Sequence, residues 1–157
     1  MPLIEGGYII LSRKLIESEI WKKPPLYLKI WIYILTTAQH KQYKGLKRGQ
    51  LTTSIPEIIE ACSWYSGYRK IKPTKDQIYQ IIEWLRKPCG SNDESNDGSN
   101  TGATMITTTR ATQSMVINVV NYSVYQDSKN YGSNDGSNDG HATGATTTQQ
   151  YKQECKE

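Results

Sequence analysis

The chain has 157 residues with a hydrophobic fraction of 36%, enough for one domain but below the ~45–50% of most globular domains. Its net charge of +4 is uneven: residues 1–89 contain 15 Lys and Arg against 7 Asp and Glu, whereas residues 90–157 contain 4 against 8. The longest apolar run, residues 26–35, is too short to cross a bilayer, so we expect no membrane association. A basic first part favours a polyanionic partner such as nucleic acid, although a soluble basic protein without such a partner has the same composition.

The predicted elements begin with two helices. Apolar side chains at helical spacing follow a candidate N-cap at Ser12 over residues 11–21, and the pattern restarts at Pro25. Proline suits a first helical turn, and the apolar face that follows is broad, so the second helix is expected to be the centre of the core. A turn then leads to a short predicted strand at residues 50–53.

A helix-turn-helix pattern follows the strand. Ser54 is the predicted N-cap of a short helix, and Gly67 and Pro73 bracket an expected loop over residues 65–73. The next helix, residues 74–87, has the strongest local signals. Thr74 and Gln77 match a capping box, and isoleucine and leucine recur at i, i+3, i+4 and i+7.

The second half predicts a hairpin between two polar segments. Two β-prone runs over residues 104–120 flank a polar tip with Arg110 and Thr112. Residues 90–102 and 128–157 contain almost no large apolar side chains, so we expect a flexible insert and a disordered tail around a domain of residues 1–127.

This order of elements predicts an α+β, mainly helical fold, namely a winged helix-turn-helix with a two-stranded wing. In that fold the second helix of the pair enters the major groove and the hairpin lies beside the backbone. The candidate DNA-contacting residues lie at the two helix starts, in the loop between the helices and at the wing tip. They are Ser54, Arg69, Lys70, Lys72, Thr74, Lys75, Gln77, Tyr79, Gln80, Arg110 and Thr112.

Catalysis and metal binding have little support in the sequence. The three Cys form no C-x-x-C pair, and His40 and His141 have no partners at ligand spacing. No Gly-rich phosphate loop, paired carboxylates or Ser-His pair is present, so we expect a binding protein without cofactor or catalytic residues. Free thiols suit a reducing cytoplasm.

Three stretches resemble the N-terminal domain of phage and prophage replisome organizers, which are related in style to DnaD-like primosomal proteins. They are the opening at residues 6–41, "KRGQLTTS" at 47–54 and "MITTTRATQSMVINVVNYSVYQD" at 105–127. The resemblance implies a winged-helix domain that binds double-stranded origin DNA, with the recognition helix at 74–87 and the wing at 104–120. It also implies a linker, a C-terminal part that engages the host replicative helicase or its loader, and a tendency to self-associate.

Alternatives from two other classes stay open. One is a winged-helix transcriptional regulator of a mobile element, and the other is a primosome adaptor that contacts protein and not DNA. The long insert at 90–102 departs from the replisome-organizer pattern. No C-terminal domain is recognised after residue 127, so the helicase-engaging role is assigned to no residue.

A near-exact repeat lies in the two polar segments. "GSNDESNDGSNTGAT" at residues 90–104 returns as "GSNDGSNDGHATGAT" at 132–146, with 12 of 15 positions identical and an offset of 42 residues. The coding offset is 42 × 3 = 126 base pairs, about 12 turns of duplex at ~10.5 base pairs per turn. A flexible spacer depends on its composition and needs no fixed amino-acid sequence. We therefore hypothesise that the repeats are DNA-level binding sites of an origin inside the gene; a recent duplication without function is the alternative.

Overall fold

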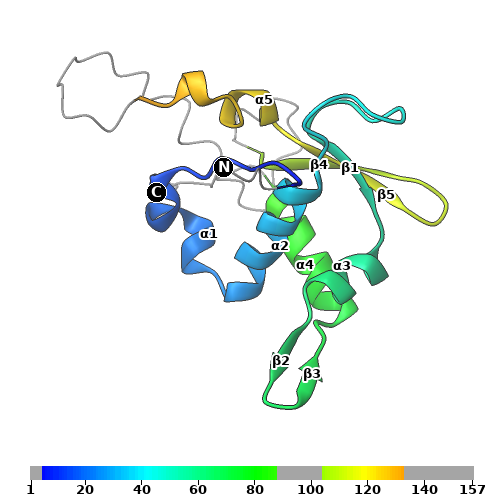
Figure 1. Cartoon of the computed structure of the whole chain (residues 1–157). Coiled ribbons are helices and arrows are strands. Elements are labelled where there is room, and N and C mark those ends of the chain that lie inside the picture. Colours follow the sequence, from blue (N-terminus) through cyan, green and yellow to red (C-terminus); the bar gives the residue numbers. More distant parts are fainter. Residues whose placement is uncertain (1–4, 88–103, 133–157) are drawn as a thin grey trace, which may run out of the picture.

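The computed structural model describes residues 5–87 and 104–132, and within them the chain has an α+β fold (Figure 1). The flexible insert, most of the expected tail and nearly all of the repeats lie outside these residues. The elements in chain order are η1 (Arg13–Glu17), α1 (Glu19–Lys22), α2 (Pro25–Thr37), β1 (Gln50–Thr53), α3 (Ile55–Ala61), β2 (Trp64–Ser66), β3 (Arg69–Ile71), α4 (Lys75–Arg86), β4 (Ile106–Arg110), β5 (Met115–Val119), α5 (Tyr122–Tyr125) and η2 (Ser128–Asn130). None of the helices in this part of the chain is long and apolar enough to cross a membrane.

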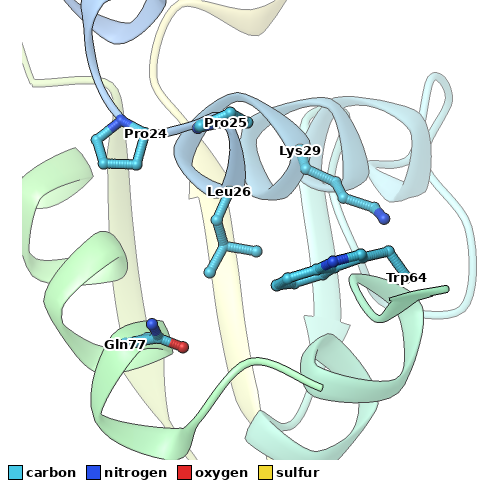
Figure 2. A pocket seen from close by; sticks show the side chains of 6 residues that line it. All are labelled: Pro24, Pro25, Leu26, Lys29, Trp64 and Gln77. Atoms are coloured by element: carbon cyan, nitrogen blue, oxygen red, sulfur yellow. The ribbon is translucent and has the colours of Figure 1, made fainter. Parts of the chain in front are cut away.

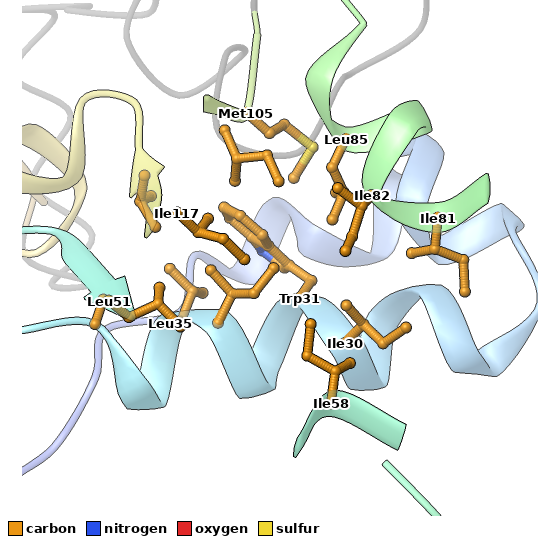
Figure 3. Close-up of a cluster of buried hydrophobic side chains, with 14 of the residues drawn as sticks. Ile30, Trp31, Leu35, Leu51, Ile58, Ile81, Ile82, Leu85, Met105 and Ile117 are labelled. Atoms are coloured by element: carbon orange, nitrogen blue, oxygen red, sulfur yellow. The ribbon is translucent and has the colours of Figure 1, made fainter. Parts of the chain in front are cut away.

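Helix α2 lies at the centre of the core, as predicted. Pro25 occupies its first turn, and the helix buries Ile30, Trp31, Ile34 and Leu35. Their side chains meet residues from α3, α4 and the sheet (Figure 3). The predicted apolar stripe of α4 is confirmed, because Ile78, Ile81, Ile82 and Leu85 are all buried.

The predicted hairpin is confirmed and gains a third strand. Strands β4 and β5 pair antiparallel, with Arg110 opposite Met115, and β1 pairs with the other edge of β5 to give the order β1-β5-β4. Thr53 is the β1 partner of Met115. The end of β1 therefore lies beside the tip of the β4–β5 hairpin, and α3 starts from that corner.

The expected loop at 65–73 was wrong, since most of it forms a second hairpin. Tyr65 pairs with Lys70, Ser66 pairs with Arg69, and Gly67 makes the turn with φ +62°. This β2–β3 hairpin extends away from the core beyond α3 and α4 (Figure 1). Every residue of β2 is exposed, and in β3 Ile71 alone is half-buried. The alternation of apolar and polar residues that marks a half-buried strand is therefore missing from the sequence.

The expected first helix is divided. Ser12 does cap it, but the helix is a 3-10 segment that ends at Ser18, after which α1 starts in a new direction. The Ser18 hydroxyl donates to the Leu15 carbonyl, and its backbone is extended with ψ 157°. A serine that bonds to its own backbone competes with helix formation.

The described residues include 128–132, which follow the expected domain end at residue 127. The Tyr131 hydroxyl donates to the Tyr125 carbonyl at 2.8 Å. Nearby, the buried Gln126 side chain accepts from the Ile10 N–H at 2.8 Å and donates to the Ile10 carbonyl at 3.0 Å. This pair of bonds fastens the N-terminal segment to the end of the domain.

Candidate nucleic-acid interface

The start of α4 is fixed by its capping box, as predicted. The Thr74 hydroxyl accepts from the Gln77 N–H at 3.2 Å, and the Gln77 side-chain oxygen accepts from the Thr74 N–H at 2.9 Å. Both side chains therefore hold the helix start. Only the amide nitrogen of Gln77 is left to donate to a ligand.

The exposed residues of α4 face more than one direction. Lys75, Tyr79 and Gln80 are exposed, and the Lys75 ammonium lies 5.8 Å from the centre of the Tyr79 ring. At ~100° per residue, Gln77 points about 160° away from Tyr79. The structure therefore brings Lys75 and Tyr79 together. Gln80 lies about 100° from Tyr79 and only about 60° from Gln77, so it stands between the two directions.

Two carboxylates share the exposed side of α4. Asp76 lies one turn before Gln80, and Glu83 lies one turn after Tyr79, where it pairs with Arg86 at 3.3 Å. These carboxylates offset the positive charge of Lys75 and Arg86, so the exposed side of α4 is less basic than the sequence totals indicate.

The cations in and beside the β2–β3 hairpin differ in whether they form ion pairs. Glu60 at the end of α3 pairs with Lys72 at 3.0 Å and also with Lys70. Hydrogen bonding and the charges of both lysines lower the pKa of Glu60, with the Lys70 bond as the largest cause, and the same bond raises the pKa of Lys70. Arg69 is exposed and has no ion pair within the described residues.

The tip of the β4–β5 hairpin, the predicted wing tip, joins the two strands. Arg110 and Thr112 are exposed, and the turn is closed by the Ala111 N–H, which donates to the Ser114 carbonyl at 2.8 Å. Ser54 lies at the neighbouring corner, half-buried, where its hydroxyl accepts from the Glu57 N–H at 3.4 Å. The register of β1 and β5 brings this start of α3 close to the wing tip.

The candidate residues thus form two groups. The residues of the β2–β3 hairpin lie next to the start of α4, whereas Ser54 and the wing-tip residues lie at the opposite end of α3. This second group contains Ser54, Arg110 and Thr112. A single ligand that touches both groups must run along α3 and α4.

Two features escaped the sequence analysis. Residues 41–48 contain Lys41, Lys44, Lys47 and Arg48, all exposed, and no acid; this run of charge was visible in the sequence. The second feature is a pocket between α2, β2 and α4, which no local pattern predicts because its lining residues are far apart in the chain.

No group of three or more His, Cys, Asp or Glu in residues 5–87 and 104–132 could hold a metal ion. Comparison with protein-family models, with curated proteins and with solved structures finds no match for this chain.

Proposed function

We propose that this chain is a winged-helix protein that binds double-stranded DNA in a sequence-specific way, as the origin-recognition part of a replisome organizer. The observation that carries the proposal is the topology. Helix α2, strand β1, helices α3 and α4 and the β4–β5 hairpin follow one another in the winged-helix order, and β1 closes the sheet against β5.

In the proposed complex, the first turns of α4 enter the major groove. Gln80 is the residue best suited to read a base, because a Gln side chain can bond adenine through two hydrogen bonds. Lys75 and Tyr79 lie together on the adjoining side of the helix, about 100° or more from Gln80, and reach the phosphates. Thr74 and Gln77 serve this contact indirectly, by holding the helix start rigid.

The flanking contacts are electrostatic. Arg110 and Thr112 at the wing tip meet the backbone or the minor groove, and Ser54 lies at a helix start, where backbone N–H groups attract phosphate. Arg69 adds a further cation for phosphate. Lys70 and Lys72 contribute less positive charge, because both form ion pairs with Glu60. These contacts position the protein and carry no base information.

The wider role rests on the sequence resemblance alone. It implies the host replicative helicase or its loader and a second copy of the chain as further partners; the cytoplasm as location is inferred separately, from the free thiols. A transcriptional regulator of a mobile element uses the same DNA surface, and a primosome adaptor does not need it at all.

Footprinting on the gene's own locus tests the proposal. We expect protection within the segment that encodes the two repeats. The logarithm of the binding constant should fall linearly with the logarithm of the salt concentration. The control is a locus recoded synonymously, which encodes the same protein. Protection of a promoter would support the regulator, the absence of any salt slope would support the adaptor, and equal binding to the recoded locus would end the repeat hypothesis.

A further inference from the structure

The β2–β3 hairpin presents aromatic side chains that pack on nothing. Tyr65 is 70% exposed and Tyr68 is fully exposed. Tyr65 lies opposite Lys70 across the two strands, and Tyr68 directly precedes Arg69. A two-stranded hairpin without a packed face is marginally stable, and exposed aromatic clusters mark binding surfaces. The hairpin is therefore poorly explained by the stability of the fold.

A pocket of about 510 Å³ lies at the base of this hairpin, within the usual range for small-ligand sites. Its lining comes from the start of α2, from β2 and from α4; the residues are Pro24, Pro25, Leu26, Lys29, Trp64 and Gln77. Figure 2 shows the Trp64 indole along one side, Gln77 at the other end and Leu26 pointing between them. Trp64 is 38% exposed, so its ring is accessible to a ligand.

Positive charge predominates around the pocket, which favours an anionic ligand. The lining contains one cation, Lys29, and no carboxylate. The Lys29 ammonium bonds the Ser63 carbonyl at 3.0 Å and lies 5.9 Å from the centre of the Trp64 ring. Residues 22–29 and 62–75, which supply five of the six lining residues, contain seven Lys and Arg and no Asp or Glu. Asp76 follows directly, and Lys22 pairs with Glu19 at 3.6 Å. Glu60 offsets part of this charge through Lys70 and Lys72.

We propose that the Trp64 pocket and the β2–β3 hairpin bind single-stranded DNA. One base enters the pocket and stacks on Trp64, the Gln77 amide nitrogen donates to its edge, and Lys29 and Arg69 hold the adjoining phosphates. Aromatic side chains beside a positive groove are the usual means of holding single strands without sequence preference. A base inside a duplex is stacked and paired, so it cannot enter this pocket.

This inference does not depend on the proposed duplex contact. Gln77 and Gln80 are neighbours on α4, about 60° apart, but Trp64 and Lys29 of the pocket take no part in the proposed duplex contact, and Arg110 and Thr112 take no part in the pocket. Either binding activity can fail while the other persists.

The test is fluorescence anisotropy of the full chain with labelled oligothymidylate of about 15 nucleotides, the upper end of the site size of one single-strand-binding module, in parallel with the duplex of the repeat region. Trp64→Ala should weaken oligothymidylate binding about five- to 150-fold, the range for loss of one stacked base. Trp64→Phe should retain most of the oligothymidylate affinity, because a phenyl ring also stacks on a base. The matched aromatic control is Tyr43→Ala, a 56% exposed residue outside the pocket, which should leave binding unchanged.

A second pair of variants covers the case in which Trp64→Ala unfolds. Lys29→Ala should weaken oligothymidylate binding and reduce its salt slope, whereas Lys41→Ala removes the same charge beyond the other end of α2 and should do neither. Wild-type affinity in Trp64→Ala, or equal effects of the two lysine substitutions, would overturn the proposal. Unchanged oligothymidylate binding in Arg110→Ala, with weakened duplex binding, would show that the two surfaces act separately.

Discussion

Gly49 joins the basic segment at 41–48 to strand β1, and we predict that it tolerates no side chain. Its φ is +84°, a conformation that L residues rarely adopt. A Cβ at this position would lie 2.6 Å from the Tyr122 Cβ and 3.0 Å from its Cγ, far inside the ~3.5–4.0 Å of a normal carbon contact. Tyr122 is buried, and its Cβ cannot move away by a side-chain rotation.

The magnitude for Gly49→Ala has two parts. The left-handed backbone costs an alanine about 1–2 kcal/mol, and overpacking against a rigid neighbour costs about 1–3 kcal/mol more. We expect a loss of about 2–5 kcal/mol in the free energy of unfolding, a large share of the ~5–15 kcal/mol of a typical domain. The shift should appear in the urea midpoint, with little change in slope.

Gly45→Ala is the matched control, because Gly45 has φ +80° and no atom lies within 4 Å of the place that its Cβ would take. It should suffer the backbone cost alone, partly offset by the reduced entropy of the unfolded chain. Equal destabilisation by the two substitutions would refute the reasoning, since the Tyr122 contact would then contribute nothing.

Four further outcomes are expected. Gln80→Ala should relax sequence preference at one base pair, at about 1–3 kcal/mol, in a binding-site selection assay; an unchanged selected sequence would remove α4 from the groove. Arg110→Ala should weaken binding to all duplexes alike and lower the salt slope by about one, and a slope equal to wild type would leave the wing without a DNA contact. Gln126→Ala should lower the free energy of unfolding by about 1–3 kcal/mol, because the Ile10 backbone loses both partners; unaltered thermal melting would contradict the fastening role. Burial raises the pKa of Tyr125 from 10 to about 12, so the fold favours the neutral hydroxyl over the ionised one. This part of the free energy of unfolding should be fully present below pH 10 and should be lost as the pH rises towards 12. Tyr125→Phe should reduce the loss of stability over that pH range by on the order of 2 kcal/mol.

Local signals explain which elements the sequence could predict. Helix α4 needs only its capping box and its stripe of isoleucine and leucine, and both are readable within 15 consecutive residues. The β4–β5 hairpin was predictable because Ile106 and Ile117 belong to β-prone runs around a polar turn. These signals depend on neighbours along the chain and not on distant contacts.

Distant contacts decided the parts that could not be predicted. The Gln126 bonds to Ile10 join residues 116 positions apart, and no periodicity reports such a pairing. The pocket likewise needs Trp64, Leu26 and Gln77 from three elements. The sequence also predicted a larger and more basic site than the structure has. Gln77 and Tyr79 are close in the chain but point away from each other in the helix. Glu60, in addition, forms ion pairs with Lys70 and Lys72.

The β2–β3 hairpin links the two proposed activities. It replaces the expected loop between α3 and α4, so it lies next to the helix start that would enter the major groove. A duplex held by α4 and the wing would therefore present any locally opened strand near Trp64. If both proposals hold, melted DNA would be captured where the duplex is recognised. The order of events would then have a physical basis: Gln80 and Arg110 would contact the duplex first, and the aromatic hairpin would act only after base pairs open, since stacked bases cannot reach the pocket.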